Sequence, residues 1–434
     1  MHATLAEWIG REAVTFSPDS PDTFDRAVDT VLSSLSDSVE LLGFGEALHG
    51  GEDILLLRNR LFQRLVTAHG YSAIAIESSF PASRLVNEYI GGSAGGADAR
   101  SSYADVKERG FSHDFGRVEA NRELVEWMRS YNVDPSHPAK LRFLGFDIPG
   151  LHGYASPRQV LHFALDYLSS IVSSSGQTHR ERIDAVLGQD AEWENPAVYM
   201  DPSKAVGLSP AAAALRIATE DLITELRTHR PECIARSSRD AYAEALQHAL
   251  VARELLNSHA GLAAKAGYAA LLGIRDALMA DTLVHIVDRE RDRSGGERAN
   301  VFVFAHNGHL QRGKIAFPVL GEWWPAGSHL NETLGRRYAV IGSAVVASES
   351  NGIGAPEAGS LEALLAASGG PVRFIPTHGG SGLQAAEIAS LPTRSGSKRN
   401  PTYQPLRPQS LTDFDFLAVL DSTPYTRGGR PLPS

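Results

Sequence analysis

The sequence predicts an α/β protein with a mainly parallel β-sheet flanked by helices, and with an all-helical insertion that bounds an active-site cleft. Three observations support this fold class. Short, continuous apolar runs recur along the chain, as in strands that are buried on both faces. Helical patterns separate many of these runs, which is typical of layered α/β architectures. The strand signal then disappears between about residues 156 and 293, where helical patterns dominate.

Seven apolar runs account for the predicted strands. They are Val39–Phe44, Ala73–Ile76, Leu141–Phe146, Val301–Phe304, Tyr338–Val346, Val372–Ile375 and Phe416–Leu420. Most of these runs do not alternate between apolar and polar residues. They therefore favour a parallel sheet, because crossover helices cover both faces of such a sheet.

Helical patterns occupy residues 54–69, where Gly70 follows as a C-cap, and Glu119–Tyr131. Three longer patterns fill the central stretch, namely Pro210–Thr228, Asp240–Ser258 and Tyr268–Arg289. We therefore divide the chain into an α/β core, 1–155 and 294–434, and a helical insertion or cap, 156–293. The two parts are expected to form one continuous unit.

Composition restricts the classes of protein to consider. With 434 residues, of which 43% are hydrophobic and 21% charged, the chain can bury a large core, which excludes wholesale disorder. A net charge of −10, without a basic stripe that contains aromatic residues, argues against a nucleic-acid partner. Cys233 is the only cysteine, which excludes an internal disulfide and a cysteine zinc cluster.

The sequence predicts neither a signal peptide nor a membrane span. Residues 1–16 lack a basic segment followed by a long apolar run. No stretch approaches the roughly 20 apolar residues that a membrane span requires. We therefore expect a cytoplasmic protein that acts on a small molecule and has no membrane partner, and the sequence leaves its oligomeric state open.

Ionisable residues follow four of the predicted strands at their C-terminal ends. These residues are Glu46 and His49, Glu77, Asp147, and the pair His306 and His309. Ligands of open α/β sheets bind at this edge. We therefore predict a single site there, although Asp147 alone is equally compatible with a cap of the turn before Pro149.

The residue types suit proton-transfer chemistry. A histidine is the natural general base near neutral pH, and a neighbouring carboxylate can orient its ring and stabilise its cation. A second pair of histidines can donate to a developing oxyanion or protonate a leaving alkoxide. Glycines on both sides of Glu46 and His49 allow the backbone to turn sharply beside a ligand.

Arg58 is expected to join this site, because it falls inside the apolar arc of its helix. A buried arginine is rarely unpaired, and Glu46 or Glu77 is the expected partner. The alternative is a side chain that reaches out to solvent. His113, Arg117, Asn307 and Asp147 are the candidate substrate-binding residues, although His113 and Arg117 also suit a solvated loop.

The same residues suggest a metal site as an alternative. Glu46, His49, Glu77, His306 and His309 offer nitrogen and oxygen ligands that suit zinc or manganese. An inward Arg58 would repel a divalent cation, however. We therefore expect no metal and no cofactor, and a metal-dependent hydrolase stays open as an alternative.

Five short motifs together resemble the erythromycin esterase family. They are GEALHG at 45–50, Ile76-Glu77, WMRSYN at 127–132, Arg275-Asp276 with Met279-Ala280, and AHNGHL at 305–310. The resemblance extends over nearly the whole chain and includes the stretches 338–342, 359–365 and 414–421. Each motif is short, and their order and spacing carry the specificity.

The resemblance implies metal-independent ester hydrolysis, best known as the opening of a macrolide lactone, in a deep cleft between an α/β core and a helical part. It implies that His49 is the general base that activates water. Glu46, Arg58, Glu77, His306 and His309 match the other important site positions of the family. The chain departs from the family at Phe111–Arg117, where a tryptophan-rich stretch is replaced by FSHDFGR.

The leading hypothesis is therefore a hydrolase acting on an ester or lactone of a natural-product-like substrate, with macrolides among the candidates. A second hypothesis keeps the site but assigns it acyl transfer, cyclisation or elimination in a biosynthetic pathway. A third is a binding or sequestration protein without catalysis, which the intact set of ionisable residues disfavours. The metal-dependent hydrolase is the fourth.

Overall fold

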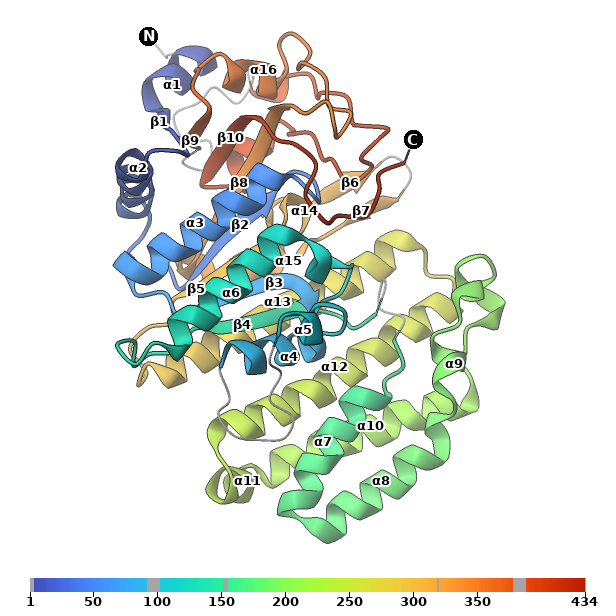
Figure 1. The fold of residues 1–434 in the computed structure, drawn as a ribbon. Helices are drawn as coiled ribbons and strands as arrows, with labels where there is room; N and C mark the ends of the chain where they lie inside the picture. The colour runs from blue at the N-terminus through green and yellow to red at the C-terminus, as the bar shows by residue number, and fades with distance from the viewer. Residues whose placement is uncertain (1–3, 92–101, 151–154, 318–319, 378–387, 434) are drawn as a thin grey trace.

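The computed structural model describes residues 4–91, 102–150, 155–317, 320–377 and 388–433. Within these residues, one eight-stranded sheet runs through the molecule in the order β1-β9-β10-β8-β2-β5-β3-β4 (Figure 1). Its strands are β1 (Val14–Phe16), β2 (Leu41–Glu46), β3 (Ala73–Ser79), β4 (Arg142–Asp147), β5 (Val301–His306), β8 (Tyr338–Ala347), β9 (Val372–Pro376) and β10 (Phe416–Ser422). A small second sheet pairs β6 (Ile315–Phe317) with β7 (Gly321–Trp323).

All seven predicted strands are present, and the mainly parallel sheet is confirmed. The neighbours from β10 to β4 pair in parallel, whereas β9 is antiparallel to both β10 and β1. The sequence patterns missed β1, β6 and β7, because three residues are too few to show a periodicity.

The two faces of the sheet carry side chains of different size. Phe44, Ile76 and Phe304 belong to a core that includes helices α2 (Pro21–Ser34), α3 (Glu52–His69) and α6 (Glu119–Val133). The intervening positions, such as Ala75 and Val303, face a second core with α1 (Leu5–Glu12), α15 (Ala326–Leu334) and α16 (Leu361–Ala366). The sheet is therefore buried on both faces, which explains the continuous apolar runs.

The described part of the central stretch contains helices and connecting loops but no strand, and it forms a body beside the sheet (Figure 1). The helices are α7 (Arg158–Ile171), α8 (Ser173–Leu187), α9 (Asp190–Trp193), η3 (Pro196–Tyr199), η4 (Pro202–Lys204), α10 (Pro210–Thr228), α11 (Arg230–Arg236), α12 (Arg239–Ala263) and α13 (Tyr268–Arg293). Helix α13 connects the two parts, because Leu278 packs in the core of the helical body and Met279 packs on the sheet.

The remaining helices connect strands or cover their ends. They are α4 (Phe80–Ile90), α5 (Ala104–Lys107), η1 (Phe115–Arg117), α14 (Asn307–Leu310), η5 (Gly335–Arg337) and α18 (Ser410–Asp413). No helix among the residues that the structure describes is both long enough and apolar enough to cross a membrane.

The glycines around Glu46 have distinct roles. Gly50 adopts a φ of 81° before α3, a conformation that glycine tolerates without strain. Gly45 instead allows a close approach, because a Cβ atom at this position would lie 2.3 Å from Oδ1 of Asn307. That asparagine oxygen accepts from the backbone N–H of Ser343 at 3.0 Å, so it is not free to move away.

We expect Gly45→Ala to lower the free energy of unfolding by about 2 kcal/mol, because the added methyl group overpacks the contact with Asn307. Chemical denaturation measures this loss. Gly10→Ala is the matched control, since a Cβ there meets no atom within 4 Å and alanine is favoured inside α1. Equal stabilities of the two variants would contradict the close approach.

Candidate active site

Four adjacent strands, β2, β5, β3 and β4, bring the predicted ionisable residues to one edge of the sheet. Glu46 ends β2, Glu77 lies two residues before the end of β3, and Asp147 ends β4. His306 ends β5, and α14 then turns His309 back toward Glu77. The expectation that these residues share one edge therefore agrees with the strand order.

Glu46 and His49 form the most exposed pair of the site. Nδ1 of His49 lies 2.6 Å from Oε1 of Glu46, and Nε2 lies 4.0 Å from Oε1 of Glu77. The His49 side chain is 31% exposed, whereas that of Glu46 is 4% exposed. The backbone of His49 is fixed as well, because its N–H donates to Thr402 and its carbonyl accepts from Asn400.

The two residues of this pair perturb each other's pKa. Burial alone disfavours the imidazolium of His49, but the charge of Glu46, its hydrogen bond and the charge of Glu77 raise the pKa of His49 above its usual value. Burial raises the pKa of Glu46, and the charge of His49 only partly opposes this effect. Both groups therefore bind a proton more tightly in the folded chain than they would in water.

Arg275 of α13 links two further carboxylates of the edge. Its Nε and Nη2 donate to the two oxygens of Asp147 at 2.8 and 2.7 Å, and Nη2 also donates to Glu77 at 3.1 Å. Burial would raise the pKa of both acids. The charge of Arg275 lowers the pKa of Asp147, and the charges of His309, His49 and Arg275 lower that of Glu77. Both carboxyl groups are therefore ionised at neutral pH.

His309 is held as a cation by two acids. Its Nδ1 lies 2.6 Å from Oδ1 of Asp276, and its Nε2 lies 3.3 Å from Glu77. Asp276 is fully buried and also accepts from Nε1 of Trp323 and the backbone N–H of Ala326. Although burial favours the neutral ring, the charges of Asp276 and Glu77 raise the pKa of His309 to about 10.

His306 is a neutral histidine whose two ring nitrogens are both occupied. Its Nε2–H donates to the carbonyl of Thr402 at 2.8 Å, and its Nδ1 accepts from the backbone N–H of Gly308 at 3.1 Å. Burial and the nearby charge of His49 lower the pKa of His306 to about 3. The N–H of His306 that was expected to donate to the substrate therefore donates to Thr402 instead. The ring packs against His49, with centroids 5.2 Å apart.

Arg58 is buried as expected, with 1% exposure, and its hydrogen bonds go to an amide oxygen, although Glu46 interacts with its charge. Within the described residues, Nε and Nη2 donate to Oδ1 of Asn59 at 3.0 and 2.7 Å. The guanidinium also lies over the ring of Phe304 at 4.7 Å. Burial lowers the pKa of Arg58 to about 10, and its charge still reaches Glu46.

The four candidate substrate-binding residues divide into two groups. His113 and Asp147 lie at the site, with Nε2 of His113 3.3 Å from Oδ2 of Asp147. Arg117 instead pairs with Glu108 at 2.9 Å and is 56% exposed. Asn307 exchanges two hydrogen bonds with the backbone of Ser343, so its amide fastens α14 to β8.

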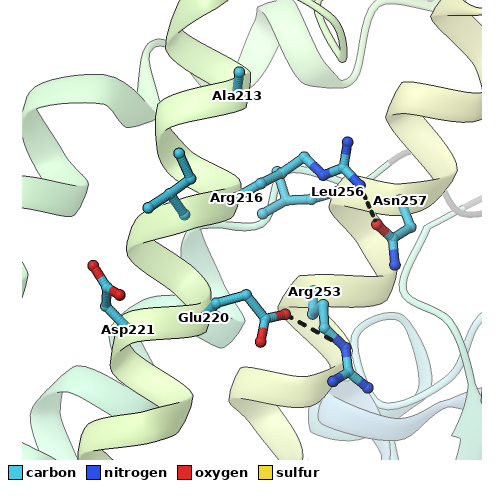
Figure 2. A pocket seen from close by; sticks show the side chains of 8 residues that line it. Ala213, Arg216, Glu220, Asp221, Arg253, Leu256 and Asn257 are labelled. Atoms are coloured by element: carbon cyan, nitrogen blue, oxygen red, sulfur yellow. Dashed lines mark hydrogen bonds and ion pairs between the residues drawn. The ribbon is translucent and has the colours of Figure 1, made fainter.

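A cavity of about 20 Å³ lies behind the Glu46–His49 pair. It is lined by Glu46, Gly50, Leu55, Arg58, Ile76, Glu77, Phe115, Val118, Asn121 and Phe304. A larger groove of about 440 Å³ lies on α10 and α12 and is lined by residues of the helical body alone (Figure 2). Among the described residues, no group of three or more histidine, cysteine or acidic side chains has the arrangement of a metal site.

Comparison with known proteins places the chain in a family. The model of the family described as erythromycin esterase matches residues 66–423. The chain belongs to the erythromycin esterase family. Two relatives from Escherichia coli are erythromycin esterase type II, 23% identical over 77% of this chain and 76% of the relative, and erythromycin esterase type I, 23% identical over 73% of each.

Solved structures share the fold of this family member. They include a Bacillus cereus protein (TM-score 0.72, 98% of each chain), a succinoglycan biosynthesis protein (0.70, 97% of each chain) and an erythromycin esterase mutant in its open conformation (0.65, 94% of this chain and 95% of that one). Each is 17% identical to this chain. Membership of the erythromycin esterase family identifies the chain as an esterase-like hydrolase.

The sequence patterns did not identify Arg275 and Asp276 as site residues, although both belong to a motif of the erythromycin esterase resemblance. The available signal was an adjacent base and acid in an otherwise apolar stretch of helix, since buried charges require partners. Asn400 and Thr402 were missed because they lie on a loop more than 350 residues from His49 in the chain, and no local pattern connects them.

We expect Asp276→Asn to weaken the pH dependence of stability in alkaline solution. The pKa of His309 is higher in the folded chain, about 10, than in the unfolded chain. The ion pair therefore stabilises the fold fully below about pH 6.5, and this stabilisation is lost as the pH rises toward 10. Between pH 7 and 10 the wild-type chain should lose about 2 kcal/mol more than the variant, as measured by urea denaturation.

The matched control is Asp413→Asn, which removes another buried aspartate that is not paired with a histidine. This variant should keep the wild-type decline in stability above pH 7. A decline in Asp276→Asn as steep as that of the wild-type chain would show that His309 is not held as a cation.

Proposed function

We propose that this chain hydrolyses an ester or lactone of a natural-product-like small molecule, and that His49 is the general base that activates water without a metal ion. One observation carries the proposal. Glu46 holds Nδ1 of His49 at 2.6 Å, which leaves Nε2 as the basic nitrogen, 4.0 Å from Glu77, on a side chain that is 31% exposed. Family membership supports the hydrolase class, and the roles of individual residues are our inference.

The Glu46–His49 geometry suits proton abstraction. A hydrogen bond from Nδ1–H to the carboxylate selects the tautomer whose Nε2 carries the lone pair. When Nε2 accepts a proton from water, the charge of Glu46 stabilises the resulting imidazolium. Oε1 of Glu77 lies 4.0 Å from Nε2, close enough for one attacking water molecule to contact both atoms.

Fixed positive charges lie beside this position. His309 and Arg275 both contact Oε1 of Glu77 and are 12% and 11% exposed. Because they are prearranged and poorly hydrated, they can stabilise the negative charge that develops on the carbonyl oxygen. The cationic His309 can also protonate the leaving alkoxide. These roles replace the one that the sequence patterns gave to His306.

The loop of residues 111–117 supplies contacts for the substrate. The ring of Phe115 packs edge-on against His49, with centroids 5.6 Å apart, and His113 lies beside Phe115. These contacts place an apolar surface and a polar group next to the reacting position. We therefore propose lactones and esters with a large apolar part, and macrolides remain the first compounds to test.

We expect His49→Gln to lower kcat about 1000-fold and Glu46→Gln about 100-fold, since each removes part of general-base catalysis. His162→Gln is the matched control, because His162 forms a 2.8 Å pair with Asp184 that lies outside the site. Mass spectrometry of a panel of macrolides and smaller lactones measures turnover, and hydrolysis adds one water to the product. Wild-type rates in His49→Gln would exclude this base.

The pH dependence of kcat/KM should follow the His49–Glu46 pair. Because the pKa of His49 is raised and the neutral ring is the active form, activity should fall as the pH drops through a value above the usual one of about 6.5. In Glu46→Gln the pKa of His49 decreases, so the acid limb should move to lower pH while the plateau rate decreases. An acid limb that does not move in Glu46→Gln would show that Glu46 does not control the pKa of the general base.

Removal of metal ions should leave the activity unchanged. Dialysis against a chelator, followed by elemental analysis and assay, tests this expectation. Activity that is lost on chelation and restored by zinc or manganese would contradict the proposed mechanism.

A further inference from the structure

The cavity behind Glu46 contains two buried oxygen atoms without a hydrogen-bond partner among the described residues. They are Oε2 of Glu46 and Oδ1 of Asn121, which belong to side chains of residues that are 3% and 4% exposed. Buried polar atoms are nearly always satisfied, by protein groups or by bound water. Two orphaned oxygens that line one cavity therefore indicate a common partner.

The chemistry of the two atoms restricts that partner. Nδ2 of Asn121 already donates to the carbonyl of Phe115 at 2.8 Å, so its Oδ1 can only accept. Oε2 of an ionised Glu46 is also an acceptor. Two acceptors cannot bond each other, and they require a molecule that donates twice. A water molecule does so, and the cavity volume of about 20 Å³ exceeds the roughly 10–15 Å³ that one water molecule needs.

The other polar groups of the cavity complete this arrangement. Both oxygens of Glu77 are occupied, Oε1 by Arg275 and Oε2 by the backbone N–H of His306, so Glu77 does not compete. Arg58 also lines the cavity, and its positively charged guanidinium can donate to the oxygen of a water molecule there. A water molecule here would therefore have three polar neighbours, which is a typical number for buried water.

We propose that one structural water molecule in this cavity bridges Oε2 of Glu46 and Oδ1 of Asn121, and that Asn121 is thereby a positioning residue of the Glu46–His49 pair. The inference rests on the proposed function for its catalytic consequence. A hydrogen bond to Oε2 stabilises ionised Glu46, which must attract the proton on His49. Since Asn121 is also bonded to Phe115, the water connects the substrate loop to the base.

The first test measures the titration of His49 in the intact chain by NMR, with labelled histidines and His49→Gln to assign the signal. Asn121→Leu removes the acceptor, and Val118→Ile fills the cavity while leaving Asn121 in place. In both variants a proton moves from His49 to the less stabilised Glu46, so the apparent pKa of His49 should decrease by about one unit.

The control is Asn132→Leu, which removes another buried asparagine of α6 whose amide bonds the backbone of Leu141. This variant should lose stability without moving the His49 titration. A His49 titration that is unchanged in both cavity variants, or equally lowered in Asn132→Leu, overturns the proposal. Neither result depends on turnover, so failure here is distinguishable from failure of the proposed hydrolase function.

The second test is a crystal structure of the wild-type chain at a resolution that shows ordered water. We expect one water molecule within hydrogen-bond distance of both Glu46 Oε2 and Asn121 Oδ1, and its loss in Val118→Ile. A direct bond between Asn121 and a protonated Glu46 overturns the proposal. Once a substrate is found, Asn121→Leu should lower kcat about 10-fold with KM unchanged, whereas a change in KM alone would assign Asn121 to substrate binding.

Discussion

The ion pairs of Arg275 are the interaction on which the site depends. This arginine comes from α13, whereas its partners Glu77 and Asp147 come from β3 and β4. All three side chains are nearly buried, and an isolated charge in such a place costs several kcal/mol. Each residue is therefore acceptable only because the others are present, and the position of α13 is tied to the edge of the sheet.

The next residue of the same helix extends this constraint in another direction. Asp276 holds His309, and it also binds Trp323 and the start of α15. Two consecutive residues of α13 therefore fix the acids of β3 and β4 on one side and the histidine after β5 on the other. A helix that packs on the sheet through Met279 thus organises the charges of a site whose other members follow the strand ends.

Three histidines of one edge are placed in three different protonation states by their neighbours. Two acids hold His309 as a cation, burial and the charge of His49 keep His306 neutral, and the partly exposed His49 beside Glu46 can change its charge. Of the three, only His49 can take up a proton during a reaction near neutral pH. The division follows from the partner of each ring, and not from the residue type, which is the same in all three.

This dependence on partners explains what could be predicted from the sequence. The seven longer strands, the sheet flanked by helices and the shared edge follow from local patterns, because apolar runs and chain order determine which strand ends meet. The roles of His306, Arg58 and Asn307 could not be predicted, because Thr402, Asn59 and Ser343 occupy their polar atoms. Residue type and burial predicted that Arg58 needs a partner, but its hydrogen-bond acceptor is the side-chain amide of Asn59 and not a carboxylate.

The buried charged residues of the site and its exposed residues are suited to different tasks, namely chemistry and substrate specificity. Glu46, Glu77, Asp147 and Asp276 are almost inaccessible, so a substrate of the proposed reaction would meet mainly His49 and the loop that carries His113 and Phe115. That loop contains His113 and Asp114 at positive φ, a strained conformation that its contacts must maintain. Changes in residues 111–117 can therefore alter the surface presented to a substrate while the buried charges stay in place.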